Sequence, residues 1–186
     1  MDERETGELL AGRGVIRRGH FLRLSGRHTD WYVQCARLFE DADTAGLIGA
    51  ELAARAAPWG ADVVLCAAVG GVLPGYETAR AMGLRMVFCE KRDGALILRR
   101  GFELPPGARV LLVEDEVSTG QSVREMCEIV HALGGTVAGI VCVVDKSGGG
   151  LPFPAPFSAL YTLSAAHYRP AACPLCQEGA PLENAG

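Results

Sequence analysis

The stretch RVLLVEDEVSTGQS, residues 109–122, decides the fold that we expect for this chain. Its apolar run VLLV is too short for a helix and suits a strand that is buried on both faces. Two acids, Glu114 and Asp115, follow where that strand is expected to end. A turn of small residues comes next, and a helical pattern then runs from Gln121 to about Leu133. The order predicts a strand, a polar turn and a helix N-terminus within one short segment.

A phosphorylated ribose is the ligand that this segment predicts. Backbone N–H groups at a helix N-terminus are free, and the helix dipole favours an anion there. The hydroxyls of Ser118, Thr119 and Ser122 add donors, and Gly120 lets the backbone approach a phosphate closely. The two acids would repel a phosphate, so we assign them to the hydroxyls of the sugar.

The segment resembles the 5-phosphoribosyl 1-pyrophosphate (PRPP) motif of type I phosphoribosyltransferases. That motif has an apolar strand, an acidic pair, two further residues and Thr-Thr-Gly; here Ser118 replaces the first Thr, and Glu116 stands where an apolar residue is usual. The resemblance implies an α/β fold with a central, mostly parallel sheet flanked by helices and a small N-terminal hood. The PRPP-binding residues that it implies in this segment are Glu114, Asp115, Glu116, Val117, Ser118, Thr119, Gly120, Gln121 and Ser122.

Length and composition narrow the class of protein. A chain of 186 residues, 49% of them hydrophobic, suffices for one well-packed domain over residues 1–186. Strand-like and helix-like segments alternate, which is typical of α/β folds. The net charge of −4 argues against nucleic acid or an anionic membrane as a partner. No apolar run reaches membrane-spanning length, the N-terminus is charged rather than signal-like, and the seven cysteines mostly lie in apolar segments, so we expect a cytoplasmic protein with reduced thiols.

The segment from His20 to Gln34 predicts two short strands around a Ser25-Gly26 turn. It resembles the N-terminal segment of orotate phosphoribosyltransferases, which helps to form the base pocket. The resemblance implies a hood made by residues 15–35 and the C-terminal tail, with Tyr32 contacting the base. A hydrophobic hairpin that merely covers the sheet is the alternative.

Two further segments resemble phosphate-contacting parts of the family. Gly70 and Gly71 lie between an expected strand and an expected helix and resemble its pyrophosphate loop, although several members have Lys in place of Gly70. Lys91 is the best match to the basic loop that closes over PRPP, often from a neighbouring subunit. The resemblance implies that Lys91 is catalytic, together with the acids Glu114 and Asp115. A solvated charged turn is the alternative.

The remaining matches concern the base and the tail. Ser118 and Lys146 are expected to contact the base, although the family commonly has Arg in place of Lys146, which gives a bidentate contact to the orotate carboxylate. The tail contains CPLC, Cys173 to Cys176. With His167 as the one nearby histidine, this motif offers three ligands where a structural zinc needs four, so we predict no metal bound directly by the protein. Mg²⁺ is expected to arrive with PRPP.

The resemblance is strongest to orotate phosphoribosyltransferases. It implies transfer of a phosphoribosyl group from PRPP to orotate, giving orotidine 5′-phosphate and pyrophosphate in pyrimidine synthesis, by a homodimer. Three alternatives stay open at this point: a phosphoribosyltransferase for another base, a PRPP-sensing regulator without turnover, and a general sugar-phosphate-binding α/β protein.

Overall fold

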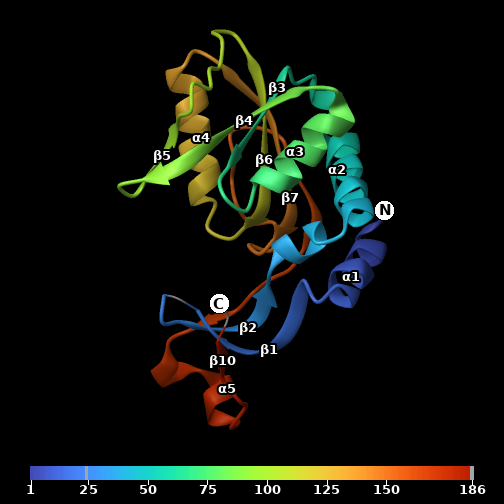
Figure 1. The fold of residues 1–186 in the computed structure, drawn as a ribbon. Helices are drawn as coiled ribbons and strands as arrows, with labels where there is room; N and C mark the ends of the chain where they lie inside the picture. The colour runs from blue at the N-terminus through green and yellow to red at the C-terminus, as the bar shows by residue number, and fades with distance from the viewer. Residues whose placement is uncertain (24, 185–186) are drawn as a thin grey trace.

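The computed structural model describes residues 1–23 and 25–184, and its largest element is a six-stranded sheet (Figure 1). The strand order is β5-β4-β3-β6-β7-β8. All neighbouring pairs are parallel except β4 and β5, which form an antiparallel hairpin. The strands are β3 (Val63–Ala67), β4 (Arg85–Arg92), β5 (Ala95–Leu98), β6 (Arg109–Val117), β7 (Thr136–Asp145) and β8 (Phe157–Thr162).

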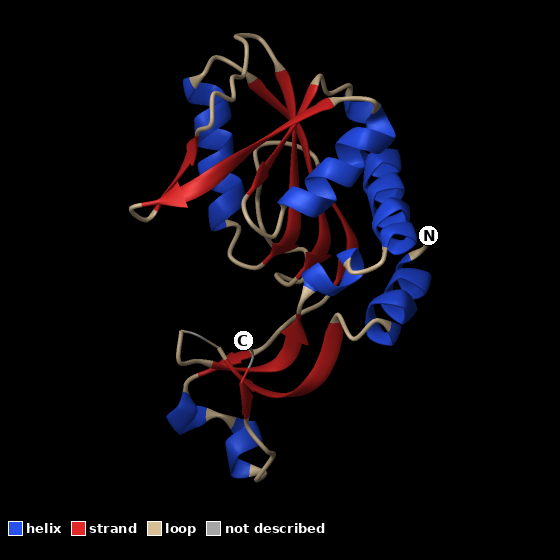
Figure 2. Cartoon of the chain, viewed as in Figure 1, coloured by secondary structure: helices blue, strands red, loops and turns tan. Residues whose placement is uncertain are grey.

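Helices cover both faces of this sheet, which buries the central strand β6 on both sides (Figure 2). Helices α2 (Ala42–Ala56) and α3 (Val72–Met82) lie on one face and α4 (Gln121–Ala132) on the other. Along β6, Leu111 and Val113 belong to the hydrophobic core beneath α2 and α3, whereas Val110 and Leu112 belong to the core beneath α4. The alternation follows from the two-residue period of a strand and confirms the predicted strand with two buried faces.

The second sheet forms the hood and lies apart from the main body (Figure 1). Its order is β10-β1-β2-β9, made of β1 (Ile16–Leu22), β2 (His28–Val33), β9 (His167–Tyr168) and β10 (Glu183–Asn184). The predicted turn is present, because the amide of Gly26 donates to the carbonyl of Arg23 between β1 and β2. Both ends of the chain therefore contribute to the hood, together with the short helix α5 (Pro174–Gln177).

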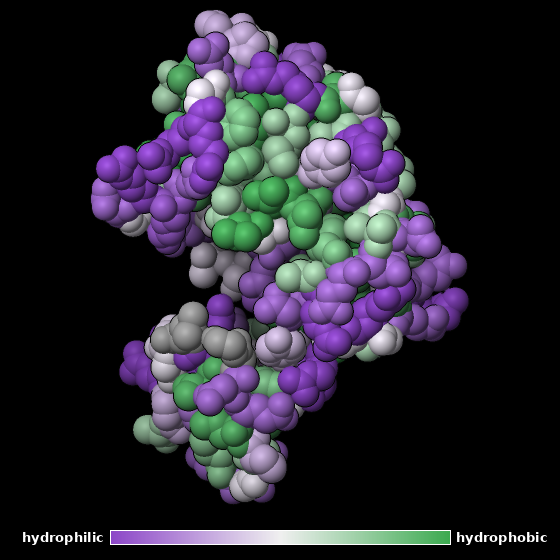
Figure 3. All heavy atoms as spheres, viewed as in Figure 1, coloured by the Kyte–Doolittle hydropathy of each residue, from purple (hydrophilic) through white to green (hydrophobic). Residues whose placement is uncertain are grey.

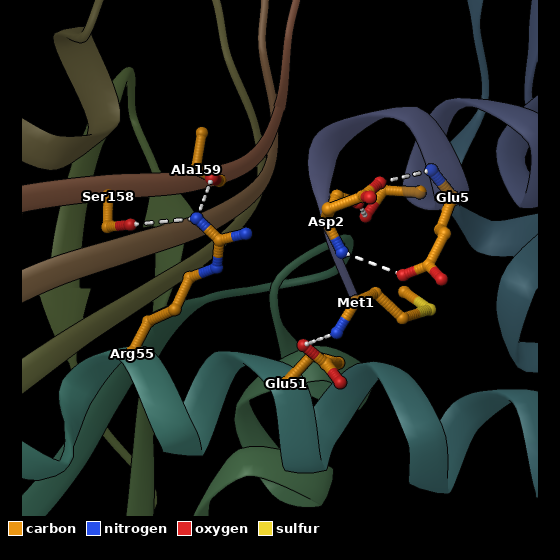
Figure 4. Close-up of polar contacts among 8 residues, drawn as sticks. Met1, Asp2, Glu5, Glu51, Arg55, Ser158 and Ala159 are labelled. Atoms are coloured by element: carbon orange, nitrogen blue, oxygen red, sulfur yellow. Dashed lines mark hydrogen bonds and ion pairs between the residues drawn. The ribbon is translucent and has the colours of Figure 1, made fainter.

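Helix α1 (Glu3–Gly12) joins the hood to the body (Figure 1), and Figure 4 shows the polar contacts at its start. Asp2 and Glu5 form a capping box at its start, with both hydrogen bonds 2.8 Å long. The N-terminal ammonium lies 2.7 Å from Glu51 of α2. One turn further along α2, Arg55 donates to the carbonyl of Ala159 on β8. These contacts fix α1 and α2 relative to the sheet edge.

Several boundaries differ from the sequence predictions. Strand β6 continues through both acids to Val117, because β7 offers pairing partners as far as Asp145. Strand β4 continues to Arg92, which restricts the predicted charged turn to Asp93 and Gly94. The N-cap of α2 is Asp41, whose carboxylate accepts from the Thr44 amide at 2.8 Å.

The short 3₁₀ turns complete the description. They span Cys35–Phe39, Ala57–Trp59 and Pro170–Ala172. Among residues 1–23 and 25–184, no helix combines the length and apolar character needed to cross a membrane.

Candidate active site

The turn after β6 presents an open helix N-terminus. Gly120 is the N-cap of α4 in the left-handed conformation, with φ of 72°, and no side chain caps the helix there. The amides of Gln121, Ser122 and Val123 precede the first intrahelical hydrogen bond, which Arg124 donates to Gly120. The Gln121 amide makes a long hydrogen bond of 3.4 Å to Oγ1 of Thr119. The other two amides and the positive end of the dipole face the same space, as the sequence predicts for an anion site.

A cavity of about 270 Å³ opens at this turn. Its walls come from the carboxyl ends of β3 and β6, from the start of α4 and from the β4–β5 hairpin, which is where ligands bind in open α/β sheets. The residues that line it are Ala67, Ala68, Lys91, Leu96, Glu114, Glu116, Val117, Ser118, Thr119, Gly120, Gln121, Ser122, Val123 and Glu125. The cavity thus brings together nine of the twelve predicted PRPP-binding residues, and Asp115, Gly70 and Gly71 are not among the residues that line it.

Glu114 lines the cavity, Asp115 beside it faces Gly70, and the pKa values of both carboxyls are raised. Glu114 is 5% exposed, and burial, with the charges of Asp115 and Glu116 beside it, raises its pKa to about 8. Burial also raises the pKa of Asp115, and Glu116 adds to the effect. Crowded, desolvated carboxylates of this kind favour a ligand that brings positive charge or donated hydrogen bonds.

Gly70 and Gly71 approach these acids from the loop before α3. A Cβ placed on Gly70 would overlap the carboxylate of Asp115, and one on Gly71 would lie 3.1 Å from Oε2 of Glu114. The predicted pyrophosphate loop therefore packs directly against the acidic pair. Only a residue without a side chain fits at position 70 without displacing Asp115.

Lys91 supplies positive charge to the cavity of its own chain. It lies on β4, opposite Leu96 of the hairpin, and lines the cavity wall. Arg100, which follows β5, already has a protein partner, because its guanidinium donates two hydrogen bonds of 2.8 and 2.9 Å to the carboxylate of Glu90. Figure 3 shows the protruding hairpin as a hydrophilic surface.

A second cavity, of about 580 Å³, lies on the hood side of the same turn. It shares Ser118 and Thr119 with the first cavity, so a ligand could continue from one into the other. Its lining contains three cationic side chains and no acid: Arg23, Ser25, Arg27, Ser118, Thr119, Lys146, Ser147, Ser164, Ala165 and His167. Burial lowers the pKa of His167, and the positive charges of Arg23 and Lys146 lower it further, which marks the cavity as electropositive.

Lys146 is held at the edge of this cavity by two contacts. Its amide donates to the carbonyl of Val117 at 2.7 Å, and its Nζ lies 2.7 Å from Oε1 of Glu116. The carboxylate of Asp145 accepts from the amides of Ser147 and Gly149, which fixes the loop that follows β7. The predicted base contacts Ser118 and Lys146 thus lie in one cavity.

Tyr32 lies elsewhere. Its ring packs 5.6 Å from that of Phe21, beneath the guanidinium of Arg17, and it lines neither cavity. The sequence did not identify Arg23 and Arg27 as site residues. They lie on either side of the hairpin turn and line the second cavity, which Tyr32 does not. Their place beside the Ser25-Gly26 turn was the available signal.

The predicted environment of the CPLC motif was also wrong. His167, the histidine considered as its neighbour, lies with Nε2 3.5 Å from Arg23 and lines the second cavity. The structure brings His20 and His28 to the two cysteines instead. These histidines are more than 140 residues away in the chain, so proximity in the sequence could not identify them.

Comparison with known proteins supports the geometric assignment. Residues 42–157 match the family described as the phosphoribosyl transferase domain. The orotate phosphoribosyltransferase of Pelotomaculum thermopropionicum is 45% identical over 186 residues, covering 100% of this chain and 98% of that protein. The orotate phosphoribosyltransferase of Caldanaerobacter subterraneus subsp. tengcongensis is 42% identical, with the same coverage.

Solved structures show the same fold. Orotate phosphoribosyltransferase from Mycobacterium tuberculosis H37Rv, in complex with inorganic phosphate, is 27% identical with a TM-score of 0.66, covering 87% of this chain and 96% of that one. The Aeropyrum pernix orotate phosphoribosyltransferase is 24% identical with a TM-score of 0.69, covering 84% and 92% of the two chains. At 24% identity, the Aeropyrum pernix structure supports the fold of this chain and not its function.

Proposed function

The chain belongs to the phosphoribosyltransferase family, and we propose that this member transfers the 5-phosphoribosyl group of PRPP to orotate. The products are orotidine 5′-phosphate and pyrophosphate. The relatives named orotate phosphoribosyltransferase span the whole chain, which supports this activity. The observation that carries the choice of base is the charge of the second cavity. Arg23, Arg27 and Lys146 line it and no acid does, although Lys146 also pairs with Glu116 at its edge. Orotate is an anion, and uracil, adenine and hypoxanthine are not.

The first cavity supplies the PRPP site in this proposal. The amides and hydroxyls from Ser118 to Ser122 hold the 5-phosphate at the start of α4. The carboxylates of Glu114 and Asp115 accept from the ribose hydroxyls. The adjoining Gly70 and Gly71 leave room for the pyrophosphate close to the backbone.

The protein itself forms no covalent bond to the substrates in this reaction. The anomeric carbon loses its bond to pyrophosphate and gains one to the base nitrogen, through a state with positive charge on the sugar. Glu114 and Asp115, when ionised, place negative charge beside that sugar, and Lys91 neutralises charge on the departing pyrophosphate. Catalysis thus comes from positioning and electrostatics.

Mg²⁺ fits the donor set of this site. Three carboxylates, those of Glu114, Asp115 and Glu116, lie close together at the end of β6. Lys146 pairs with Glu116, which leaves the buried pair as oxygen donors suited to a hydrated magnesium–PRPP complex. When bound, the ion would offset the charge of the pyrophosphate. The protein's own part is to hold the sugar hydroxyls and the 5-phosphate.

We also propose a cytoplasmic homodimer. Large apolar side chains are exposed on α2, on α3 and on the loop before α3, namely Leu47, Val69, Leu73 and Tyr76. Figure 3 shows a hydrophobic patch around the beginning of α3. Such a patch is typical of an interface. Sedimentation of the wild type and of Leu73→Glu would test it, with a dimer expected only for the wild type.

The direct test of the activity is pyrophosphate release from PRPP and Mg²⁺ with orotate, beside uracil, adenine, guanine, hypoxanthine and xanthine. We expect release with orotate that Asp115→Asn abolishes and Glu128→Gln, an exposed acid on α4, preserves. Release with another base would support the proposed PRPP site but would show that orotate is not the base. PRPP binding without release on any base would contradict the proposal and favour a regulator.

A further inference from the structure

Four metal-ligating side chains meet at the end of the hood remote from the main body. We call them the His₂Cys₂ cluster: His20 on β1, His28 at the start of β2, Cys173 just before α5 and Cys176 within α5. One ligand atom from each lies within 4.8 Å of the others. Three of the four residues are buried, and the proposed transfer reaction uses none of them.

The spacing within the cluster approaches that of a tetrahedral metal site. The sulfur–nitrogen distances are 3.5 Å from Cys173 to His20, 3.6 Å from Cys176 to His20 and 3.3 Å from Cys176 to His28. Zn–N bonds of about 2.0–2.1 Å and Zn–S bonds of about 2.3 Å place the ligand atoms of a tetrahedron about 3.3–3.8 Å apart. The nitrogens of His20 and His28 are 2.8 Å apart and need to separate by only about half an ångström.

The orientation of His20 is fixed as in a metal ligand. Its Nδ1 lies 2.9 Å from the carbonyl oxygen of Ala180, to which it donates, and this leaves Nε2 unprotonated and directed at the cysteines. Zinc-bound histidines are commonly held by such a hydrogen bond from the other ring nitrogen. The acceptor comes from the tail, beyond α5, so the same contact ties the tail to β1.

Local backbone structure brings His20 into place. The pairing of β1 with β2 shifts between Arg18 and Phe21, so β1 carries one extra residue there. A bulge of this kind re-aims a side chain, and both His20 and Phe21 are buried as a result. On the other side, the CPLC turn places Cys173 and Cys176 on one short helical turn.

The tail has little else to hold it. Cys173 is the only buried residue between positions 169 and 184. Neither Cys173 nor Phe21 belongs to the two hydrophobic cores of the protein. A small lobe with so little apolar burial needs another source of stability, and a structural metal is a common one.

We propose that the His₂Cys₂ cluster binds one structural Zn²⁺ ion that fastens the C-terminal tail to the hood hairpin. Two thiolates and two neutral imidazoles match the charge and ligand preferences of zinc. Four protein ligands leave no open position, so the ion has a structural role and not a catalytic one. The proposal does not depend on the transferase activity.

The test is the metal content of the full chain, purified without chelators and measured by mass spectrometry. We expect about one zinc per chain in the wild type, and loss of stoichiometric zinc in Cys176→Ser and His28→Gln. Matched controls are Cys127→Ala and His131→Gln, both on α4, which should keep their zinc. Protein that holds no zinc and takes up none from added zinc chloride would overturn the proposal, as would Cys176→Ser with undiminished zinc.

X-ray absorption spectroscopy at the zinc edge is a second test, and because it uses the wild-type protein it does not depend on whether any variant folds. Two sulfur and two nitrogen neighbours around zinc are expected, at about 2.3 and 2.0–2.1 Å. A shell of oxygen and nitrogen alone would show that the ion lies elsewhere and contradict the proposal. Chelation should also expose the bond after Tyr168 to chymotrypsin, while cleavage in the β4–β5 hairpin stays unchanged.

Discussion

Nζ of Lys146 lies 2.7 Å from Oε1 of Glu116, and this pair stands between the two cavities of the active site. The ammonium is largely buried, with 10% of its side chain exposed, whereas Glu116 is 31% exposed. A lysine placed in this way can neutralise Glu116, contact the substrate carboxylate, or do both. The two roles make different predictions.

Replacing Lys146 separates them. If the ammonium binds the orotate carboxylate, Lys146→Met should raise the KM for orotate roughly tenfold or more and leave the KM for PRPP nearly unchanged, since a charged hydrogen bond contributes about 1.5–3 kcal/mol. Steady-state kinetics with each substrate varied in turn measures this. The double variant Lys146→Met/Glu116→Gln is the control. Recovery of the orotate KM in the double variant would show that the lysine only neutralises Glu116.

The arginines of the hood turn should act on the same substrate. Arg23→Ala and Arg27→Ala are each expected to raise the KM for orotate several-fold, because both line the cavity that receives its carboxylate. The effect should weaken as salt is added, since both side chains are accessible to solvent. Arg4→Ala on α1, whose guanidinium pairs with Glu8, is the matched control. Equal effects of all three substitutions would argue against a specific contact.

Gly70 should tolerate no side chain. In Gly70→Ala the new Cβ would overlap the Asp115 carboxylate and displace it from the ribose hydroxyls, so we expect PRPP binding to be lost. Calorimetric titration with PRPP measures the loss. Gly12→Ala, at the end of α1, has no atom within 4 Å of the new Cβ and should bind PRPP like the wild type. Unchanged affinity in Gly70→Ala would place the sugar elsewhere.

Glu114 should make the stability of the protein depend on pH. Its pKa is about 8 when folded, above its ordinary value of 4.5, so the folded state retains a proton that the unfolded state releases. The stabilisation is complete below about pH 4.5 and is lost as the pH rises through about 8. Between pH 5 and 9, the wild type should therefore lose a few kcal/mol more unfolding free energy than Glu114→Gln. Urea titrations at both pH values measure it, and parallel losses in the two proteins would contradict the shift.

The sequence predicted the parts of the protein that depend on local pattern. The apolar run before Glu114, the glycine turn and the helix after it specify a buried strand and an open helix N-terminus, and the structure has both. The end of β6 was placed too early, because charged residues such as Glu116 still pair with the neighbouring strand. Pairing across the sheet is not visible in a local pattern.

Contacts between segments that are distant in the chain could not be predicted from local sequence patterns. Arg27 reaches the base cavity only because the hood folds over the loop after β7. The CPLC motif gains two histidines only because a bulge in β1 turns His20 toward a tail more than 150 residues away. The pKa of Glu114 depends likewise on burial, which composition does not show.

The most direct measurement of the central claim compares orotate with uracil, since the two bases differ by one carboxylate. We expect kcat/KM with PRPP to be at least a thousandfold higher for orotate, in line with the roughly 10⁴-fold discrimination of sites built around a polar group. The ratio should fall sharply in Arg27→Ala and Lys146→Met and stay unchanged in Arg4→Ala. Comparable rates for the two bases in the wild type would contradict the account, because the cationic cavity would then not be reading the carboxylate.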